Sequence, residues 1–378
     1  MKIGFDAKRV FHNFRGLGNY SRTLIESLIK HFPEEEYLLF TPPFKDTRAL
    51  AWEKRFDNVS VITPTRSVDK LMSSAWRSFF MDRDISKNGV DIYHGLSHEL
   101  PSNLRDRGVK SVVTIHDLIF MRYPEYFPWV DRKVYFRKFK HAVDNADKVI
   151  AICEQTKADI DHFLDCRGDK VEVIQQSCHP SFYISASIET KERVRSKYDL
   201  GEHYILYVGA LEERKNALSL VQAFSRLKDH IPHKLILVGS GKDYKTKIEN
   251  EILDQGLRDR CFIKDNVPQE DLPSFYQMAD LFVYPSFFEG WGIPNVEALF
   301  SETPVITSLG SCFAESAGPN SLYIDPNRAE DIAEKMERVL FDDDLQKLMA
   351  REGRLYAEQF HWKNTSLKMI ELYRKTLG

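Results

Sequence analysis

Short apolar runs alternate with helix-like segments along nearly the whole chain, and this alternation constrains the fold more than any other feature. Each run is continuously hydrophobic, as expected for a parallel strand that is buried on both faces. The first set of strands is predicted at 2–5, 37–40, 59–62, 91–94, 111–115, 148–152 and 171–174.

The pattern restarts in the second half of the chain. Strands that alternate with helices form parallel sheets covered by helices. Two such sets predict an α/β fold of two doubly wound, Rossmann-like domains facing each other across a central cleft. The domains are predicted at 1–190 and 191–360, and the polar segment 181–201 is interpreted as the linker. The second set of strands is predicted at 204–208, 234–238, 261–263, 281–284, 304–307 and 322–324.

Length and composition exclude several classes of protein. A chain of 378 residues has room for two domains. The formal net charge of −3 argues against a nucleic-acid partner, because proteins that bind nucleic acids usually carry an excess of basic residues. The five cysteines show neither metal-ligand spacing nor a disulfide framework, which favours a cytoplasmic compartment. We find neither an apolar signal region at the N-terminus nor a run as long as a membrane-spanning helix.

The segment 289–298 holds two carboxylates, Glu289 and Glu297, between a predicted strand and a predicted helix. Ligands of open α/β sheets bind at such junctions, outside the carboxyl ends of the strands. Gly290 and Gly292 let the backbone approach a ligand, and the helix N-terminus offers N–H groups to an anion. Because carboxylates accept hydrogen bonds from hydroxyl groups, the segment predicts a site for a sugar or a ribose.

Two adjacent cations, Arg214 and Lys215, lie between Gly209 at a strand end and the start of a predicted helix. Arginine can bind oxygens bidentately, and the lysine and the helix dipole add positive charge. The motif therefore favours a diphosphate site. The alternative is a solvated cluster in which Glu212 and Glu213 pair with the cations.

Weaker signals lie at three other predicted strand ends. Gly16 and Gly18 precede a predicted helix at 21–30 and suit a phosphate or a sugar, or an ordinary turn with a helix cap. His116 follows the strand at 111–115, where it could donate a hydrogen bond to a ligand or simply cap the strand. The turn 239–241 could approach a nucleotide base.

Two acidic runs, 82–84 and 342–344, raise the question of a metal ion that neutralises a diphosphate. Neither run follows a strand end, and helix-like sequence flanks both, so we interpret them as surface charge. The adjacent cations at 214 and 215 would make a metal unnecessary. We therefore predict no metal site and no cofactor.

The segment 129–143 is amphipathic and basic. The simpler interpretation is a surface helix packed on its apolar face. The alternative is contact with anionic lipid headgroups or with a lipid-linked acceptor, which would place the protein at the inner face of a membrane. Its cations are Arg132, Lys133, Arg137, Lys138 and Lys140.

Taken together, these motifs resemble the group 1 glycosyltransferases, the retaining family 4 with the GT-B fold. The segment 123–128 is similar to a bacterial mannosyltransferase branch. The resemblance covers nearly the whole chain and includes Gly16 and Gly18, the segment 91–95, His116 and Asp117, the segment 208–216, and the pair Glu289 and Glu297.

The resemblance implies a hexosyltransferase that moves a hexose, with mannose favoured, from a GDP- or UDP-linked donor to a glycan or lipid-linked acceptor. Arg214 and Lys215 would hold the diphosphate and stabilise it as the leaving group. Glu297 would bind the ribose, and Glu289 and His116 would contact the hexose. The other donor-binding positions implied are Gly16, Gly18, Gly209, Val267, Gly290, Trp291, Gly292 and Ile293.

The resemblance also implies that the first domain binds the acceptor and that a final helix at about 361–378 completes it. Two positions depart from the family pattern. Cys153 stands where serine is common, and Asn266 stands where glycine is frequent near the base, which leaves the base open. Three alternatives remain: a nucleotide-sugar epimerase, a phosphorylase and a non-catalytic nucleotide-sugar-binding subunit.

Overall fold

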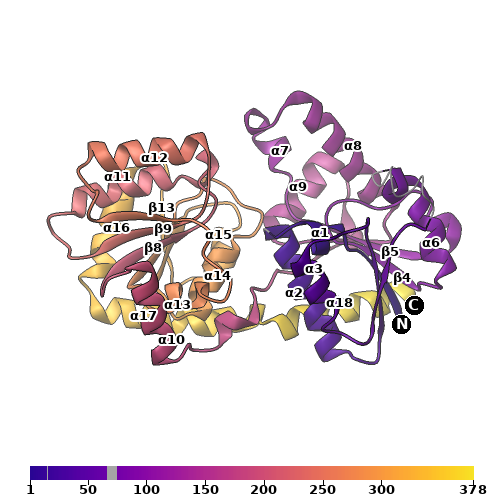
Figure 1. The fold of residues 1–378 in the computed structure, drawn as a ribbon. Helices are drawn as coiled ribbons and strands as arrows, with labels where there is room; N and C mark the ends of the chain where they lie inside the picture. The colour runs from indigo at the N-terminus through magenta and orange to yellow at the C-terminus, as the bar shows by residue number, and fades with distance from the viewer. Residues whose placement is uncertain (15, 66–74) are drawn as a thin grey trace. The chain divides into compact units, whose positions relative to one another are not determined.

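The computed structural model describes residues 1–14, 16–65 and 75–378. The chain forms two compact units, one of Met1–Ser177 with His361–Gly378 and the other of Cys178–Phe360 (Figure 1). Each unit is built on an open parallel sheet with helices on both faces. The predicted pair of doubly wound domains is confirmed, and every predicted strand is present with its ends within one residue of the prediction.

The first unit has a seven-stranded sheet in the order β3-β2-β1-β4-β5-β6-β7. Its strands are continuous apolar runs whose alternate side chains enter two cores; Val112 and Val113 of one strand point to opposite faces. The strands are β1 (Lys2–Asp6), β2 (Glu36–Phe40), β3 (Val59–Ile62), β4 (Ile92–Gly95), β5 (Lys110–Ile115), β6 (Lys148–Ala151) and β7 (Val171–Val173).

Helices cover both faces of this sheet. One face packs against α1 (Lys8–His12), α2 (Gly16–His31), α3 (Thr47–Glu53) and α18 (Trp362–Leu377). The other packs against α6 (Met81–Lys87), α8 (Trp129–Asn145) and α9 (Glu154–Leu164). The shorter elements are η1 (Trp76–Phe80), η2 (Arg105–Arg107), α7 (Ile119–Arg122), η3 (Pro124–Tyr126) and η4 (Gly168–Lys170).

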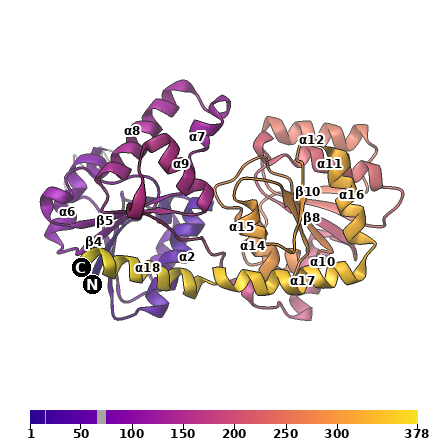
Figure 2. The ribbon, with the colours of Figure 1, turned by 180° about the vertical axis from the view of Figure 1, so that it is seen from behind.

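The last helix, α18, belongs to the first unit although it ends the chain. It lies along α2 (Figure 2). The Ser27 hydroxyl donates a hydrogen bond of 2.8 Å to the Trp362 carbonyl. Tyr373 is fully buried in the same core.

The second unit has a six-stranded sheet in the order β10-β9-β8-β11-β12-β13. Helices α11 (Ala217–Leu227), α12 (Asp243–Asp254) and α16 (Ala329–Leu340) pack together on one face (Figure 1). The other helices are α10 (Ile188–Tyr198), α13 (Leu272–Gln277), α14 (Ile293–Phe300), α15 (Phe313–Ala317) and α17 (Asp343–Ala357), with η5 (Pro180–Tyr183), η6 (Glu213–Lys215) and η7 (Glu358–Phe360). The strands are β8 (Tyr204–Val208), β9 (Lys234–Val238), β10 (Cys261–Lys264), β11 (Leu281–Tyr284), β12 (Val305–Ser308) and β13 (Leu322–Ile324).

The polar segment predicted to be a linker contains helix α10, and the boundary predicted after residue 190 falls inside this helix. Ser187 caps α10 by accepting a hydrogen bond from the Thr190 N–H. Two cations of α10 bind Asp271 of the same unit, Arg193 at 2.7 Å and Lys197 at 2.8 Å. The polar composition therefore reflects ion pairing within the second unit, which begins at Cys178.

Candidate active site

The carboxyl ends of β8, β11 and β12 meet at one edge of the second sheet. The loop after β8 carries Arg214 and Lys215, and the loop between β11 and α14 carries Glu289. The loop after β12 carries Ser311. The structure thus brings together the cation pair and the first carboxylate that the sequence predicted as one site.

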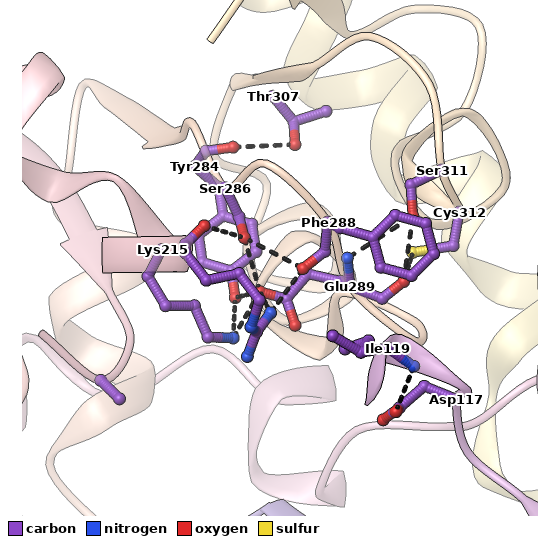
Figure 3. Close-up of polar contacts among 12 residues, drawn as sticks. Asp117, Ile119, Lys215, Tyr284, Ser286, Phe288, Glu289, Thr307, Ser311 and Cys312 are labelled. Atoms are coloured by element: carbon purple, nitrogen blue, oxygen red, sulfur yellow. Dashed lines mark hydrogen bonds and ion pairs between the residues drawn. The ribbon is translucent and has the colours of Figure 1, made fainter. Parts of the chain in front are cut away.

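Glu289 is the centre of this arrangement (Figure 3). Its Oε1 lies 2.5 Å from the Lys215 ammonium and 3.0 Å from the Arg214 guanidinium. The same oxygen accepts hydrogen bonds from the hydroxyl groups of Tyr284 at 2.9 Å and Ser286 at 2.7 Å. Four donors therefore converge on one carboxylate oxygen, and they hold the carboxylate in the ionised form.

The electrostatics follow from this geometry. Burial alone would raise the pKa of Glu289, but the charges of Lys215 and Arg214 and the hydrogen bonds hold this pKa at about 2. Glu213, which could have neutralised the cations, instead pairs with Lys247 at 2.6 Å. Arg214 and Lys215 are 18% and 14% exposed and pair with Glu289, so the interpretation of the two as a solvated cluster is wrong. Arg214, Lys215 and Glu289 together carry a net charge of +1.

Backbone contacts fix the loops that carry these side chains. Asn216 adopts a left-handed conformation with φ of 57°, and its side-chain amide donates to the carbonyls of Pro285 and Pro326. The Glu289 carbonyl accepts hydrogen bonds from Ser311 at 3.0 Å and Cys312 at 3.3 Å. We did not single out Asn216, Ser311 and Cys312 from the sequence, nor the donors Tyr284 and Ser286. Tyr284 and Ser286 lie at the end of a predicted strand, as His116 does, so the same signal could have identified them.

Glu297, the second carboxylate, lies in α14 and has a different environment from Glu289. Burial raises its pKa to about 8, although the Tyr276 hydroxyl donates a hydrogen bond of 2.9 Å to its Oε2 and opposes the shift. We find no cation bound to it within the described residues. At neutral pH this carboxyl group is largely protonated, so it can donate as well as accept a hydrogen bond.

Between the two carboxylates, the backbone needs glycine at one position. Gly292 has a φ of 81°, and a Cβ there would lie 3.0 Å from the Ser316 hydroxyl. Trp291 is buried, with its ring edge-on to Phe360 at 5.1 Å. The Trp291 side chain therefore packs in the core, so a donor could be contacted here only through the backbone of 290–293.

The turn 239–241 packs against the loop of Gly209. A Cβ on Gly239 would lie 1.8 Å from the Gly209 carbonyl oxygen, and Leu211 donates a backbone hydrogen bond of 2.9 Å to Ser240. Close loop packing is thus enough to explain Gly239. In the loop after β10, Val267 is half-buried, and Asn266 has a φ of 55°, a conformation that glycine also adopts readily.

The first unit holds the remaining predicted positions. Gly16 and Gly18 do not form a loop before a helix at 21–30, because α2 begins at Gly16. A Cβ on Gly18 would lie 1.7 Å from the Asn13 carbonyl oxygen, whereas one on Gly16 would meet nothing within 4 Å. The end of α1 packs against Gly18, so helix packing requires this glycine.

His116 is buried at the carboxyl end of β5, with both ring nitrogens engaged. Nε2 donates to the Leu96 carbonyl at 2.8 Å, and Nδ1 accepts from the Gln176 amide at 2.6 Å. Burial lowers the pKa of His116 to about 4, so the ring is neutral. The predicted contact with a sugar would require His116 to exchange one of these bonds.

Cys153 keeps a capping role where the family often has serine. Its sulfur accepts a hydrogen bond of 3.3 Å from the Thr156 N–H at the start of α9. Sulfur is a weaker acceptor than a hydroxyl oxygen, so the substitution weakens the cap without removing it.

One of the two acidic runs is not surface charge. Asp82 is 1% exposed and pairs with Arg107 at 3.0 Å, and Asp84 accepts a hydrogen bond from Trp76. The interpretation as surface charge is therefore wrong for Asp82, and it holds for 342–344, where Asp342 caps α17.

The predicted helix at 129–143 is confirmed as α8. Its buried side chains, Phe139, Ala142 and Val143, all lie in its second half. Trp129 and Val130 near its start are 59% and 61% exposed. Within the described residues, no helix combines the length and hydropathy needed to span a bilayer.

Two family models divide the chain between them. The model "Glycosyl transferases group 1" matches residues 188–356, and "Glycosyltransferase Family 4" matches residues 14–180. The chain belongs to the group 1 glycosyltransferases. This confirms the predicted family and, with it, the predicted class of enzyme, a hexosyltransferase.

Relatives of this glycosyltransferase extend over its full length. O-antigen chain mannosyltransferase B from Escherichia coli is 29% identical over 99% of this chain and 100% of its own. Sucrose-phosphate synthase from Thermosynechococcus elongatus has the same fold, with 22% identity and a TM-score of 0.79 over 99% of this chain and 98% of its own. HepE from Anabaena, solved in complex with UDP and glucose, is 18% identical with a TM-score of 0.76 over 99% of this chain and 100% of its own.

Proposed function

We propose that this glycosyltransferase moves a hexose, with mannose favoured, from a GDP- or UDP-linked donor to a glycan or lipid-linked acceptor. We also propose that transfer retains the anomeric configuration and needs no metal ion. The observation that carries the proposal is the cluster of Arg214, Lys215 and Glu289, whose net positive charge lies at the carboxyl edge of the second sheet.

The leaving group explains what such a cluster does. Negative charge develops on the donor diphosphate as the bond to the sugar breaks, and fixed cations in a water-poor site stabilise it. Arg214 and Lys215 are 18% and 14% exposed, so each can reach a ligand while Glu289 holds it in place. Two cations supply the charge that a metal would otherwise provide.

Retention asks for positioning rather than for a protein nucleophile. The acceptor hydroxyl attacks the face from which the diphosphate departs, and a diphosphate oxygen takes its proton. Glu289 faces the hexose, Glu297 binds the ribose, and backbone N–H groups of 290–293 lie near the sugar and the phosphates. Gly209 and Val267 contact the donor from the second unit, and Gly16, Gly18 and His116 are the donor-binding positions proposed in the first unit.

Mannose is favoured because a relative that matches the whole chain is named as a mannosyltransferase. The alternatives differ in their products. An epimerase would convert the donor without an acceptor, a phosphorylase would use inorganic phosphate, and a non-catalytic subunit would bind the donor without turnover. Release of the nucleoside diphosphate only when an acceptor glycan is added separates transfer from all three.

Thermal unfolding with GDP- and UDP-sugars, in the presence of chelator, tests the donor site. One donor should raise the melting temperature of the wild type, and Lys215→Ala should abolish the rise. Lys247→Ala is the matched control, because this lysine is 57% exposed and pairs with Glu213 outside the cluster. An equal rise in wild type and Lys215→Ala would refute the site, and binding that requires a divalent metal would refute metal independence.

Membrane contact is a further part of the proposal. At the start of α8, Trp129, Val130 and Val134 are exposed beside Lys133, whose ammonium lies 3.9 Å from the Trp129 ring centre. Aromatic and basic side chains together suit anionic headgroups. Flotation with anionic liposomes should carry the wild type but not Lys133→Glu/Arg137→Glu, and equal flotation of both would exclude this contact.

A further inference from the structure

Three side chains that can bind metals gather at the amino edge of the second sheet. His203 directly precedes β8, His233 directly precedes β9, and Asp280 directly precedes β11. Since β8 lies between β9 and β11, the three residues come from neighbouring strands. Glu289 follows the carboxyl end of β11, so this cluster lies at the opposite edge from the candidate active site.

The two distances from Asp280 fit a shared ion better than direct hydrogen bonds. Asp280 Oδ2 lies 3.4 Å from both His203 Nδ1 and His233 Nε2, and the three ligand atoms lie within 4.8 Å of one another. A charge-assisted N–H···O bond would measure about 2.7–2.9 Å. Two ligands of a tetrahedral ion with bonds of about 2.0–2.2 Å lie roughly 3.3–3.6 Å apart.

The backbone around the cluster is fixed. Asp280 Oδ2 accepts a hydrogen bond of 2.9 Å from the Tyr204 N–H, and the Asp280 N–H donates to the Tyr204 carbonyl at 3.0 Å. The His233 carbonyl accepts two hydrogen bonds from the Arg260 guanidinium. Such outer contacts orient the residues of a metal site before the ion arrives.

The two histidines differ in a way that suits binding from solvent. His233 is 8% exposed, and its Nε2 faces Asp280. The His203 side chain is 51% exposed, so it can rotate to close the distance between the two imidazoles. A buried ring thus provides a fixed ligand, and an exposed ring provides the entry path.

We propose that His203, His233 and Asp280 form a Zn²⁺ site. Two imidazole nitrogens and one carboxylate oxygen suit zinc, whereas Mg²⁺ and Ca²⁺ prefer oxygen ligands. Water completes the coordination on the exposed side. The ion links the starts of three strands, so it stabilises the second unit and takes no part in glycosyl transfer.

Calorimetric titration of the chelator-stripped full chain with Zn²⁺ tests this site. The wild type should bind one Zn²⁺ per chain and melt at a higher temperature with it, and Mg²⁺ should have no such effect. His203→Ala should weaken binding by about 100-fold or more. Asp280→Asn should do the same while keeping an oxygen that accepts from the Tyr204 N–H.

The matched control is His230→Ala. His230 is 62% exposed in the same unit and lies 3.9 Å from Glu337, outside the cluster. This variant should bind Zn²⁺ as the wild type does. Equal affinity in wild type and His203→Ala, or no zinc binding by the wild type, would overturn the proposal. Because binding is measured without substrate, the result is independent of the proposed function.

Discussion

Two buried clusters, one at the carboxyl edge of each sheet, differ in their chemistry. In the second unit, Glu289 is ionised between Lys215 and Arg214. In the first unit, His94 and His116 are buried and neutral, because burial lowers their pKa values to about 3 and about 4. His94 binds Tyr373 at 2.6 Å and Thr114 at 2.8 Å, so these histidines lie in neutral hydrogen bonds, whereas Asp6 at the end of β1 forms a buried ion pair with Arg77.

This difference shows that the carboxyl edges of two similar sheets can suit different kinds of ligand. Fixed charges suit a ligand that carries or develops charge, as a diphosphate does. Neutral donors and acceptors, such as those around His94 and His116, suit the hydroxyl groups of a glycan.

The largest effect is expected at the charged edge. Glu289→Ala leaves Lys215 and Arg214 without the carboxylate that positions them, so transfer should fall by about 10²- to 10³-fold or more. Steady-state assays with donor and acceptor would measure this. The control is Glu213→Ala, a neighbouring carboxylate that is 60% exposed and pairs with Lys247. Near wild-type turnover in Glu289→Ala would remove the distinction between the two edges.

The next largest effect is expected on acidification, which should destabilise the first unit before the second. The pKa of His116 is about 4 in the folded protein and about 6.5 in the unfolded chain. Below pH 6.5 the unfolded chain therefore binds a proton that the folded protein excludes, and the first unit loses stability as the pH falls. By pH 5 this loss is about 2 kcal/mol for His116, and His94 adds to it. The stabilisation that ionised Glu289 gives to the second unit is lost only below pH 4.5. The pKa of Glu297 is raised to about 8, so protonation of this group on acidification stabilises the folded second unit.

Hydrogen–deuterium exchange at pH 7 and pH 5, corrected for intrinsic rates, would measure this order. Peptides covering β4 and β5 should lose protection before those covering β11 and α14. Simultaneous loss in both units, or earlier loss in the second, would contradict the assignment of neutral and charged edges.

The strands were predictable because buried parallel strands are continuous apolar runs, and packing changes neither their position nor their length. The cluster of Glu289 with Lys215 was predictable for a related reason, since both stand just after strands that neighbour each other. Strand ends of one parallel sheet meet at one edge, so position along the chain gives position in space.

The rest depended on contacts that a sequence does not display. Nothing near His116 in the chain shows that Leu96 and Gln176 occupy both of its ring nitrogens. Helix α10 was missed because its polar residues bind Asp271, which is distant in sequence. His203, His233 and Asp280 each precede a predicted strand, yet only the strand order makes them neighbours.

Glycine substitutions in α2 test whether packing or ligand binding selects these residues. Gly18→Ala places a Cβ against the Asn13 carbonyl, so it should destabilise the first unit by roughly 1–3 kcal/mol. Gly16→Ala meets open space and should be neutral or stabilising by up to about 1 kcal/mol. Denaturant titration would measure both. If Gly16→Ala keeps its stability but loses donor affinity, its proposed place over the phosphates gains support.

The smallest effect is expected from removing one tyrosine hydroxyl group near each edge. Tyr373→Phe removes the one hydrogen-bond partner that His94 Nδ1 has among the described residues, which should cost about 1–2 kcal/mol of stability. Tyr284→Phe removes a donor to Glu289 Oε1 and an acceptor of Lys215 Nζ. Because Lys215 and Arg214 still pair with Glu289, the loss should be about 1 kcal/mol. Chemical denaturation of both variants would compare them. A larger loss for Tyr284→Phe would mean that the charged cluster depends on every donor, and that the neutral network is the more tolerant of the two edges.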